Sequence, residues 1–154
     1  MRGNLLAGNS STNKNIDGGT KMPKECFNVF DEMYKRKKFT WSDAVKKGKV
    51  IAISGTVATD ENHRTLYAGD LNAQMRYIFE SVKNLLEKMG ASMDDVIKTT
   101  DYITPQAVPD YGKTAGIRRE YFKEDGYPAA TGVVVHSLLR PDWLIEIEFL
   151  AVVD

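Results

Sequence analysis

The sequence predicts a single α+β domain with the element order β-β-α-β-α-β-β. Three observations predict it: two extended runs joined through Gly48, a strongly amphipathic segment over 70–89, and β-branched and aromatic runs over 96–104 and 143–153. The chain has 154 residues, the size of one domain with its own core. Its 42% hydrophobic and 27% charged residues point to neither a disordered chain nor a membrane protein.

Residues 1–24 are expected to form a flexible N-terminal arm, followed by one domain over 25–154. The beginning of the arm is rich in Asn, Ser, Thr, Gly and Lys. Its sizeable apolar side chains are few: Leu5, Leu6 and Ile16. So few apolar groups do not offset the entropy lost when a backbone is ordered. Residues 25–39 mix apolar and charged side chains, which predicts a short helix or an irregular segment docked on the domain.

A β-hairpin and a long helix come next. Two extended runs, Trp41–Lys46 and Val50–Val57, are joined through Gly48, because glycine adopts the positive φ that a tight hairpin turn requires. Asp70 is placed to cap the start of the helix and Gly90 to end it. Its apolar residues are spaced by threes and fours: Leu71, Met75, Ile78, Phe79, Val82, Leu85, Leu86 and Met89. This apolar stripe must pack on a sheet.

A third strand and a second helix follow. Residues 96–104 are β-branched and aromatic and predict the strand. The helix is expected over 109–122, although Gly112 and Gly116 weaken that prediction because glycine disfavours helix interiors.

Two strands close the chain, over 129–138 and 143–153, with a turn between them. One face of the last strand is an apolar row suited to packing under the helices: Trp143, Ile145, Ile147, Phe149, Ala151 and Val153. The other face mixes apolar and acidic residues: Leu144, Glu146, Glu148, Leu150 and Val152. A strand facing water does not need those apolar groups, and a buried strand does not accept two unpaired carboxylates. We therefore expect a second subunit to cover this face, with a site between subunits that holds at least one of the glutamates.

Charge and cysteine content limit the partners. Lys plus Arg, 21, balances Asp plus Glu, 21, so no long-range field draws the molecule to nucleic acid or to a membrane surface. The basic run over 35–38 is interpreted as solvated surface. A single cysteine, Cys26, excludes an intrachain disulfide, and no apolar run reaches the roughly 18 residues of a membrane helix. A cytoplasmic protein is expected. No metal is expected, since His63, His136 and Cys26 lack the spacing of zinc ligands.

Short motifs occur in a fixed order along the chain: Ile53-Ser54-Gly55-Thr56, Gln74, Gly90-Ala91-Ser92, Asp95-Val96, Pro128-Ala129-Ala130-Thr131 and Leu144-Ile145-Glu146-Ile147-Glu148. With this order and spacing the sequence resembles the Rid family of reactive-intermediate deaminases, also called the YjgF family. The resemblance implies a homotrimer with a chorismate-mutase-like fold, in which three sheets form a central β-barrel and the helices lie outside. It also implies active sites in the clefts between subunits, hydrolysis of enamines and imines to a ketoacid and ammonia, and no cofactor.

The sequence departs from the family at the substrate-binding arginine. In active deaminases the strand that begins Pro-Ala continues with an arginine that clamps the substrate carboxylate through two hydrogen bonds, and here that residue is Ala130. The family's helix asparagine falls on Ala115, and its Ser-Gly-Gln is Ser54-Gly55-Thr56. The chain therefore resembles the arginine-lacking branches, and ordinary deaminase activity on amino-acid-derived imines is not expected.

Glu146 and Arg118 are the candidate catalytic residues that the resemblance suggests. Glu146 matches the family glutamate that faces the cleft and holds or polarises a water, and the alternative interpretation is an interfacial ion pair. Glu148 is interpreted as a structural pair. Arg118 lies on the inner face of the second helix, where it would restore an anion contact, and the alternative is a surface arginine.

The other candidates are assigned to substrate binding. Trp41 stands where many members place a tyrosine that closes over the ligand, or else it belongs to the core. Tyr102 would donate a hydrogen bond into the cleft, or it too belongs to the core. Thr131 and the backbone of Ala130 would form the pocket floor. Ser54 is assigned to binding rather than to nucleophilic attack, since no histidine is expected beside it.

Two functions remain open at this point. The first is an enzyme acting on a reactive enamine, imine or related unsaturated metabolite, with water activation at Glu146 and with hydrolysis, isomerisation or ring closure as the reaction. The second is a trimeric metabolite-binding or regulatory protein without catalysis. Ribonuclease activity, known for some relatives, finds no support in the zero net charge. A positive group within reach of Glu146 would favour the enzyme.

Overall fold

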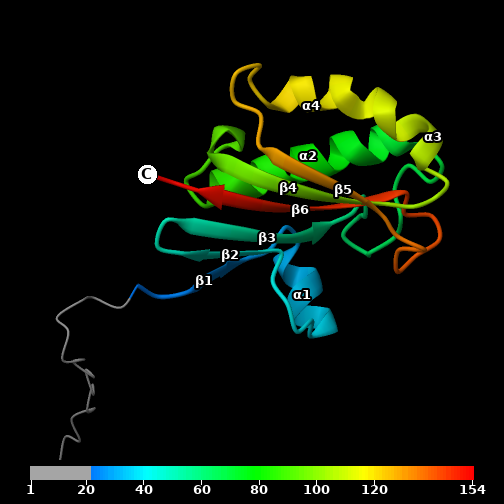
Figure 1. The fold of residues 1–154 in the computed structure, drawn as a ribbon. Helices are drawn as coiled ribbons and strands as arrows, with labels where there is room; N and C mark the ends of the chain where they lie inside the picture. The colour runs from blue at the N-terminus through cyan, green and yellow to red at the C-terminus, as the bar shows by residue number, and fades with distance from the viewer. Residues whose placement is uncertain (1–21) are drawn as a thin grey trace, which may run out of the picture.

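The computed structural model describes residues 22–154, so the predicted arm lies almost wholly outside the described residues. The helices and strands are β1 (Glu25–Phe27), α1 (Asp31–Lys37), β2 (Ala44–Lys47), β3 (Val50–Thr56), α2 (Leu71–Lys88), β4 (Val96–Ile103), α3 (Val108–Tyr111), α4 (Ala115–Tyr121), β5 (Ala129–Val134) and β6 (Ile145–Val152), with 3-10 turns at Met93–Asp95 and Gly112–Thr114. The strands form one sheet in the order β1-β2-β3-β6-β4-β5 (Figure 1). All neighbours are antiparallel except the parallel pair β4 and β5. The predicted α+β class is confirmed.

Local signals in the sequence are realised in the hairpin and the long helix. Gly48 turns the β2–β3 hairpin with a φ of +61°. The Asp70 carboxylate accepts a hydrogen bond from the backbone N–H of Ala73 at 2.9 Å, which caps α2, and Gly90 leaves the helix with a φ of +71°. These conformations follow from short-range chemistry, so the sequence predicted them directly.

Two predictions about secondary structure need correction. Residues 25–39 contain a short strand, β1, as well as the short helix α1, because residues 25–27 pair with β2 as an additional edge strand. The second helix is not continuous: α3 and α4 are separated by the 3-10 turn at Gly112–Thr114, where glycine weakens the regular helix.

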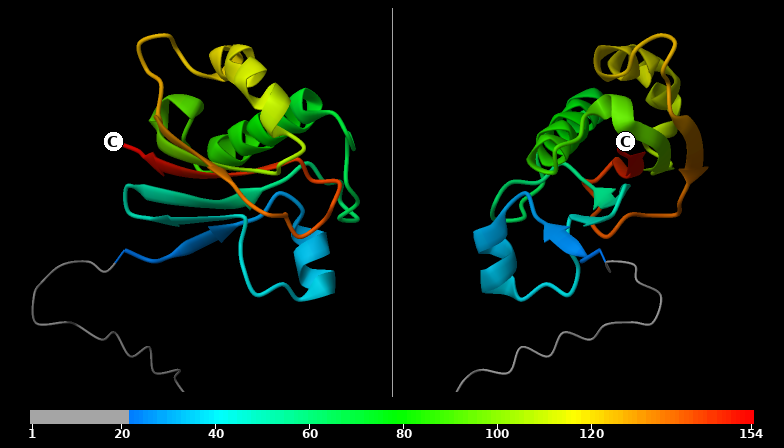
Figure 2. Two further views of the ribbon diagram at one scale, coloured as in Figure 1. Left: turned by 45° about the vertical axis from the view of Figure 1, so that its right-hand side comes forward. Right: turned by 90° about the vertical axis from the view of Figure 1, so that its left-hand side faces the viewer.

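The core lies between α2 and one face of the sheet. Phe79, Met75 and Ile78 of α2 are fully buried, and from β6 the residues Ile145 and Ile147 meet them from the sheet side. Truncating a residue such as Phe79 to alanine typically costs about 3–5 kcal/mol. Figures 1 and 2 show α2, α3 and α4 on the same side of the sheet, with α1 beside the β1–β2 edge.

The opposite sheet face has no helix over it within the described chain, as Figure 2 shows. The predicted second face of β6 lies here, half-buried from Leu144 to Leu150, with Val152 38% exposed. The neighbouring strands add further exposed apolar groups, among them Val50, Ile97 and Val133. The two-faced character of β6 expected from its sequence is therefore present.

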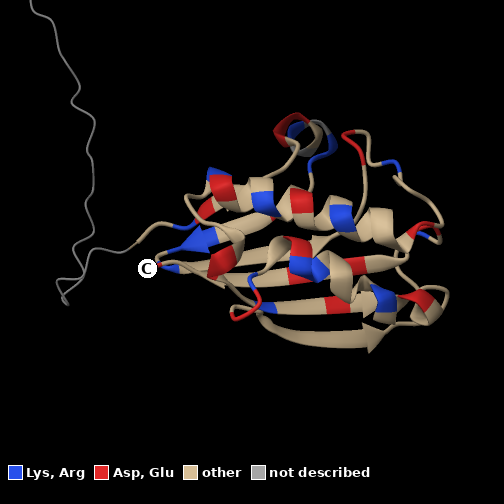
Figure 3. Ribbon diagram, turned by 90° about the horizontal axis from the view of Figure 1, so that it is seen from above, with Lys and Arg blue, Asp and Glu red and all other residues tan. Residues whose placement is uncertain are grey.

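The helices of the described residues and the charges on the helical side bear on possible membrane and nucleic-acid contacts. None of their helices combines the length and the hydrophobicity that crossing a bilayer requires. Figure 3 shows basic and acidic residues interspersed along the ribbon on the helical side of the molecule. Such mixing gives no single-sign field on that side.

Candidate active-site pocket

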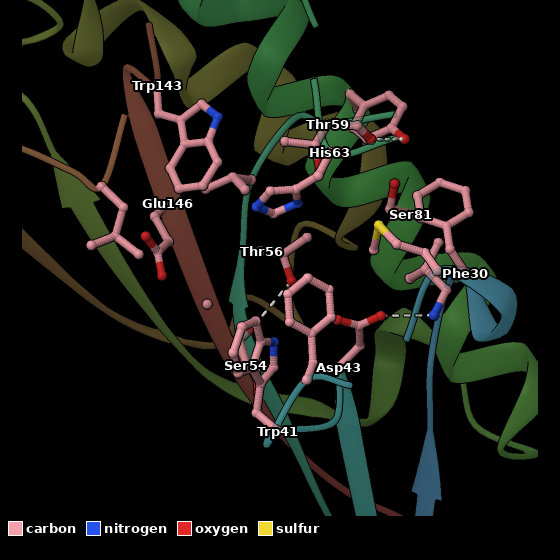
Figure 4. Close-up of a pocket in the computed structure, with 17 residues that line it drawn as sticks. Phe30, Trp41, Asp43, Ser54, Thr56, Thr59, His63, Ser81, Trp143 and Glu146 are labelled. Atoms are coloured by element: carbon pink, nitrogen blue, oxygen red, sulfur yellow. Dashed lines mark hydrogen bonds between the residues drawn. The ribbon is translucent and has the colours of Figure 1, made fainter. Parts of the chain in front are cut away.

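A pocket of about 330 Å³ opens at the junction of α1, the β2–β3 hairpin, the loop before α2 and the start of β6 (Figure 4). Its size is that of a site for a small metabolite. The residues that define its walls include Phe30, Met33, Trp41, Ser54, Gly55, His63, Trp143 and Glu146. Three sequence-predicted site residues, Trp41, Ser54 and Glu146, are thus brought together.

Glu146 lies against the backbone of Gly55. The register between β3 and β6 shifts between Ile53 and Thr56, so Ser54 and Gly55 form an irregularity in the strand. A Cβ added to Gly55 would overlap the Glu146 Oε1 atom and lie 2.8 Å from its Cδ. Only a glycine therefore leaves room for the carboxylate in this position.

The environment of Glu146 makes its carboxylate a stronger proton acceptor than that of an exposed glutamate. Burial, and then the negative charge of Glu148, raise the pKa of the Glu146 carboxyl above its usual value. No hydrogen bond or ion pair to this carboxylate is found among the side chains that the structure describes. A carboxyl group with a raised pKa in a pocket is suited to accepting and returning a proton.

Trp143 forms one wall and is held there by Gln74. The buried Gln74 amide donates to the Asp142 carbonyl at 2.8 Å and accepts from the Leu144 N–H at 2.9 Å, so it holds both neighbours of Trp143. Only 4% of Trp143 is exposed. Its buried indole N–H has no acceptor within the part of the chain that the structure describes, a condition that a water or ligand usually relieves.

His63 lines the pocket beside Trp143, and no pattern in the sequence predicted it there. The rings meet edge to face with centroids 5.7 Å apart. A turn places the histidine: its N–H donates to the Asp60 carbonyl at 2.8 Å, and its own φ is +64°. Burial, followed by the charges of Arg140 and Lys37, lowers the pKa of His63, so the imidazole is neutral near neutral pH. The positive φ of His63 is a second unusual feature, and a sequence does not display it.

Trp41 and Ser54 complete the side next to the hairpin. Trp41 is 52% exposed at the pocket wall, so it is not a core residue. The centroids of its ring and the Phe39 ring are 4.3 Å apart. The Ser54 hydroxyl donates to the Ser42 carbonyl at 2.8 Å. That bond uses its proton and leaves its oxygen as an acceptor, which suits binding better than nucleophilic attack.

The N-terminal segment supplies an apolar wall that was not expected from the sequence. Val29, Phe30 and Met33 line the pocket from α1 and the loop that precedes it. The segment is fixed by Asp43, whose carboxylate accepts from the Val29 N–H at 2.7 Å. A hydrophobic run beside charged residues does not by itself reveal which cavity it closes.

Arg118 does not join Glu146, which corrects the expectation of an anion contact in the cleft. Its guanidinium lies on the helix-covered face, where it pairs with Asp101 at 3.3 Å and donates to Thr99 at 2.9 Å. Asp101 is opposite Ile147 in the sheet register, whereas Glu146 points to the other face. Arg118 is mostly buried and does not line the pocket. Its role is to pair with the fully buried carboxylate of Asp101.

Asp101 has its own unusual environment. Burial raises the pKa of the Asp101 carboxyl, against the lowering effects of a 2.7 Å hydrogen bond from Tyr111 and of the Arg118 charge. One of its oxygens, Oδ1, has no hydrogen-bond partner among the described residues.

The other predicted residues lie outside the pocket of a single chain. Tyr102 is opposite Glu146 in the register of β4 and β6, on the same sheet face, but it does not line the cavity. Ala130 and Thr131 are exposed on the edge strand β5, where the Thr131 hydroxyl accepts a hydrogen bond from Lys98. Ala115 is exposed at the start of α4. Any contact between these residues and a pocket ligand requires another subunit.

Comparisons with known proteins agree with this architecture. Residues 35–153 match the family model described as Endoribonuclease L-PSP. A RutC family protein of Pyrococcus abyssi is 34% identical over 123 residues, which cover 80% of this chain and 94% of the relative. The 3-aminoacrylate deaminase RutC of Acinetobacter baylyi is 36% identical over 108 residues, covering 70% of this chain and 82% of the relative.

Solved structures show the same fold. RidA from the Antarctic bacterium Psychrobacter sp. has a TM-score of 0.66 and 29% identity, covering 75% of this chain and 89% of that one. A member of the YjgF/YER057c/UK114 family from Mycobacterium tuberculosis has a TM-score of 0.69 at 24% identity, covering 85% and 100%, which is a likeness of fold alone. Strand β1 and the beginning of α1 precede the residues that the family model matches.

Proposed function

The chain belongs to the Rid/YjgF family, whose model is described as Endoribonuclease L-PSP, and on that premise we propose that it is a trimeric enzyme acting on a reactive imine or enamine. The observation that carries the proposal is the carboxylate of Glu146, unpaired among the described residues and seated on Gly55 inside a largely apolar pocket. A relative, the Acinetobacter RutC, is named for 3-aminoacrylate deamination, which is chemistry of the same class.

The proposed reaction is hydrolysis of a carbon–nitrogen double bond. Glu146 accepts a proton from a water molecule while the water oxygen adds to the imine carbon. The carboxyl group then returns that proton to the nitrogen, which gives a carbinolamine. Glu146 next takes the remaining hydroxyl proton and passes it to the nitrogen while the carbon–nitrogen bond breaks, so that a carbonyl compound and ammonia leave. Burial raises the pKa of Glu146 toward neutral pH, and this direction suits the proton transfers, since a group that takes up and releases protons works best with a pKa close to the working pH.

The apolar sheet face supports a trimer as the active form. Leu150 and Val152 of β6 share this face with Glu146 and Glu148, and no helix covers them within the described chain. Burying such a face is the usual reason for association. In the proposed trimer a neighbour covers the face and closes the pocket mouth, where Trp41 is half exposed.

The substrate differs from that of an arginine-containing deaminase. Ala130 stands in place of the arginine, and Arg118 is held by Asp101 on the other side of the sheet. Neither residue offers this chain's pocket a clamp for a substrate carboxylate. The zero net charge and the mixture of acidic and basic residues on the helical side (Figure 3) give no reason to propose RNA as a substrate, despite the description of the family model.

The experiment is an imine-hydrolysis assay with substrates generated in place by amine and amino-acid oxidases. We expect Glu146→Gln to lower the rate on the order of 10²–10⁴-fold. Glu124→Gln, which alters an exposed carboxylate in the loop that follows α4, should have no effect. If the parent protein accelerates the hydrolysis of no imine but still binds a metabolite in the pocket, the alternative of a non-catalytic binding or regulatory protein is favoured.

A further inference from the structure

The charge of the pocket is one-sided. Of the side chains that the structure describes, those lining it include two carboxylates, Asp43 and Glu146, and no Lys or Arg. Asp43 already accepts the Val29 N–H. Glu146 has no such donor among the described residues, so its charge is available to a ligand.

Two cations act on His63 from outside the lining. Lys37 donates to the Asn62 carbonyl at 3.3 Å, and the Arg140 guanidinium lies 5.7 Å from the centre of the Trp143 ring. Neither one lines the pocket. A bound carboxylate would therefore face Glu146 at short range without a compensating cation from these residues, which is unfavourable.

The remaining lining suits a cation that carries an apolar group. Trp41 and Trp143 present aromatic rings to the cavity, and aromatic faces attract ammonium and iminium ions. On the side of α1, Phe30 and the buried Met33 provide an apolar surface. This surface comes from a segment that mostly precedes the residues matched by the family model.

We propose that the pocket selects a small organic cation, an ammonium or iminium ion that bears an aromatic or branched apolar group and no carboxylate. The nitrogen lies against Glu146, and the apolar group lies against Phe30 and Met33. The inference rests on the proposed function in one respect: an iminium ion would be the substrate, and the corresponding ammonium ion would be an unreactive analogue.

The test compares three probes with one skeleton: 2-phenylethylammonium, 2-phenylethanol and 3-phenylpropionate. Binding to the full chain in its native assembly is measured by titration calorimetry. We expect the ammonium ion to bind at least about tenfold more tightly than the alcohol, and the carboxylate to bind most weakly. Glu146→Gln should remove the preference for the cation.

Variants of the apolar wall provide the matched control. Met33→Ala should weaken the binding of the ammonium ion and of the alcohol by a similar factor, because it removes apolar contact and no charge. Phe30→Leu serves the same purpose if Met33→Ala does not fold. Equal binding of the three probes, tighter binding of the carboxylate, or no binding of the ammonium ion would each overturn the proposal.

The probes cannot be hydrolysed, so the binding result is independent of turnover. Tight ammonium binding in a protein that hydrolyses no imine would keep this inference and reject the proposed function. Faster hydrolysis of carboxylated imines than of uncharged ones, together with tighter binding of 3-phenylpropionate, would keep the proposed function and reject this inference.

Discussion

The carboxylate of Glu146 on the last strand lies on the backbone of Gly55 in the first hairpin, at a distance that excludes a side chain at residue 55. The contact joins a strand irregularity to the group that we propose to move protons. It also explains why a glycine occurs between Ser54 and Thr56, where its φ imposes no need for one.

Gly55→Ala is expected to displace the Glu146 side chain and lower imine hydrolysis on the order of 10²-fold. The overlapping atoms belong to the end of a flexible side chain, so the fold should survive with a melting temperature close to that of the parent. Gly116→Ala is the matched control, because an added Cβ there meets open space. Normal turnover by Gly55→Ala would show that the position of Glu146 does not matter for the reaction.

Glu146→Gln is expected to raise the melting temperature at about pH 7 by a few degrees. The folded chain holds the Glu146 proton more tightly than the unfolded chain, so this group lowers stability as the pH rises from the unfolded pKa through the folded pKa. Below the unfolded pKa the difference between parent and variant should disappear. Thermal unfolding of both proteins at several pH values from roughly 3 to 7 measures this difference in melting temperature.

The opposite result has a clear meaning. If Glu146→Gln lowers the melting temperature at neutral pH, the carboxylate is paired in the assembled protein. Its role is then structural, and the water-activation mechanism fails.

Arg118→Ala is expected to destabilise the protein by about 3–5 kcal/mol, because it leaves the buried Asp101 carboxylate without its cation. The double variant Asp101→Val with Arg118→Met should recover most of that loss, since it removes both charges and keeps apolar volume. Denaturant unfolding measures both. A loss of ligand affinity in the double variant, with stability restored, would instead return Arg118 to the binding site.

The assembly is expected to have three times the chain mass of 17.3 kDa in sedimentation or light scattering. Leu150→Arg places a charge on the uncovered sheet face and should yield monomers that lack activity. Val108→Arg alters an apolar residue of α3 that is 46% exposed on the helical side, and it should leave the mass unchanged. A fully active monomer would remove the intersubunit site.

Much of the fold follows from local patterns. The spacing of apolar residues along α2, its caps at Asp70 and Gly90, and the alternation along β6 each depend on helix or strand period, which a sequence displays directly. Strand β1 was not predicted because three residues carry too short a pattern, and pairing with β2 decides their conformation.

The candidate site divides in the same way. The resemblance of short motifs placed Glu146, Ser54 and Trp41 together, and the pocket contains all three. His63 and Met33 were missed because the turn and the helix that carry them meet the cavity only through long-range packing.

Arg118 shows most clearly what sequence patterns do not predict. Helical period correctly turned its side chain inward, toward the sheet, yet it did not say that Glu146 faces away from that side. The sequence by itself determined which residues of each element turn inward and that β6 has two different faces. Only the tertiary structure decided which inward groups share a space, because a sheet separates its two faces by the thickness of one backbone layer, and periodicity within an element carries no information about the element it meets.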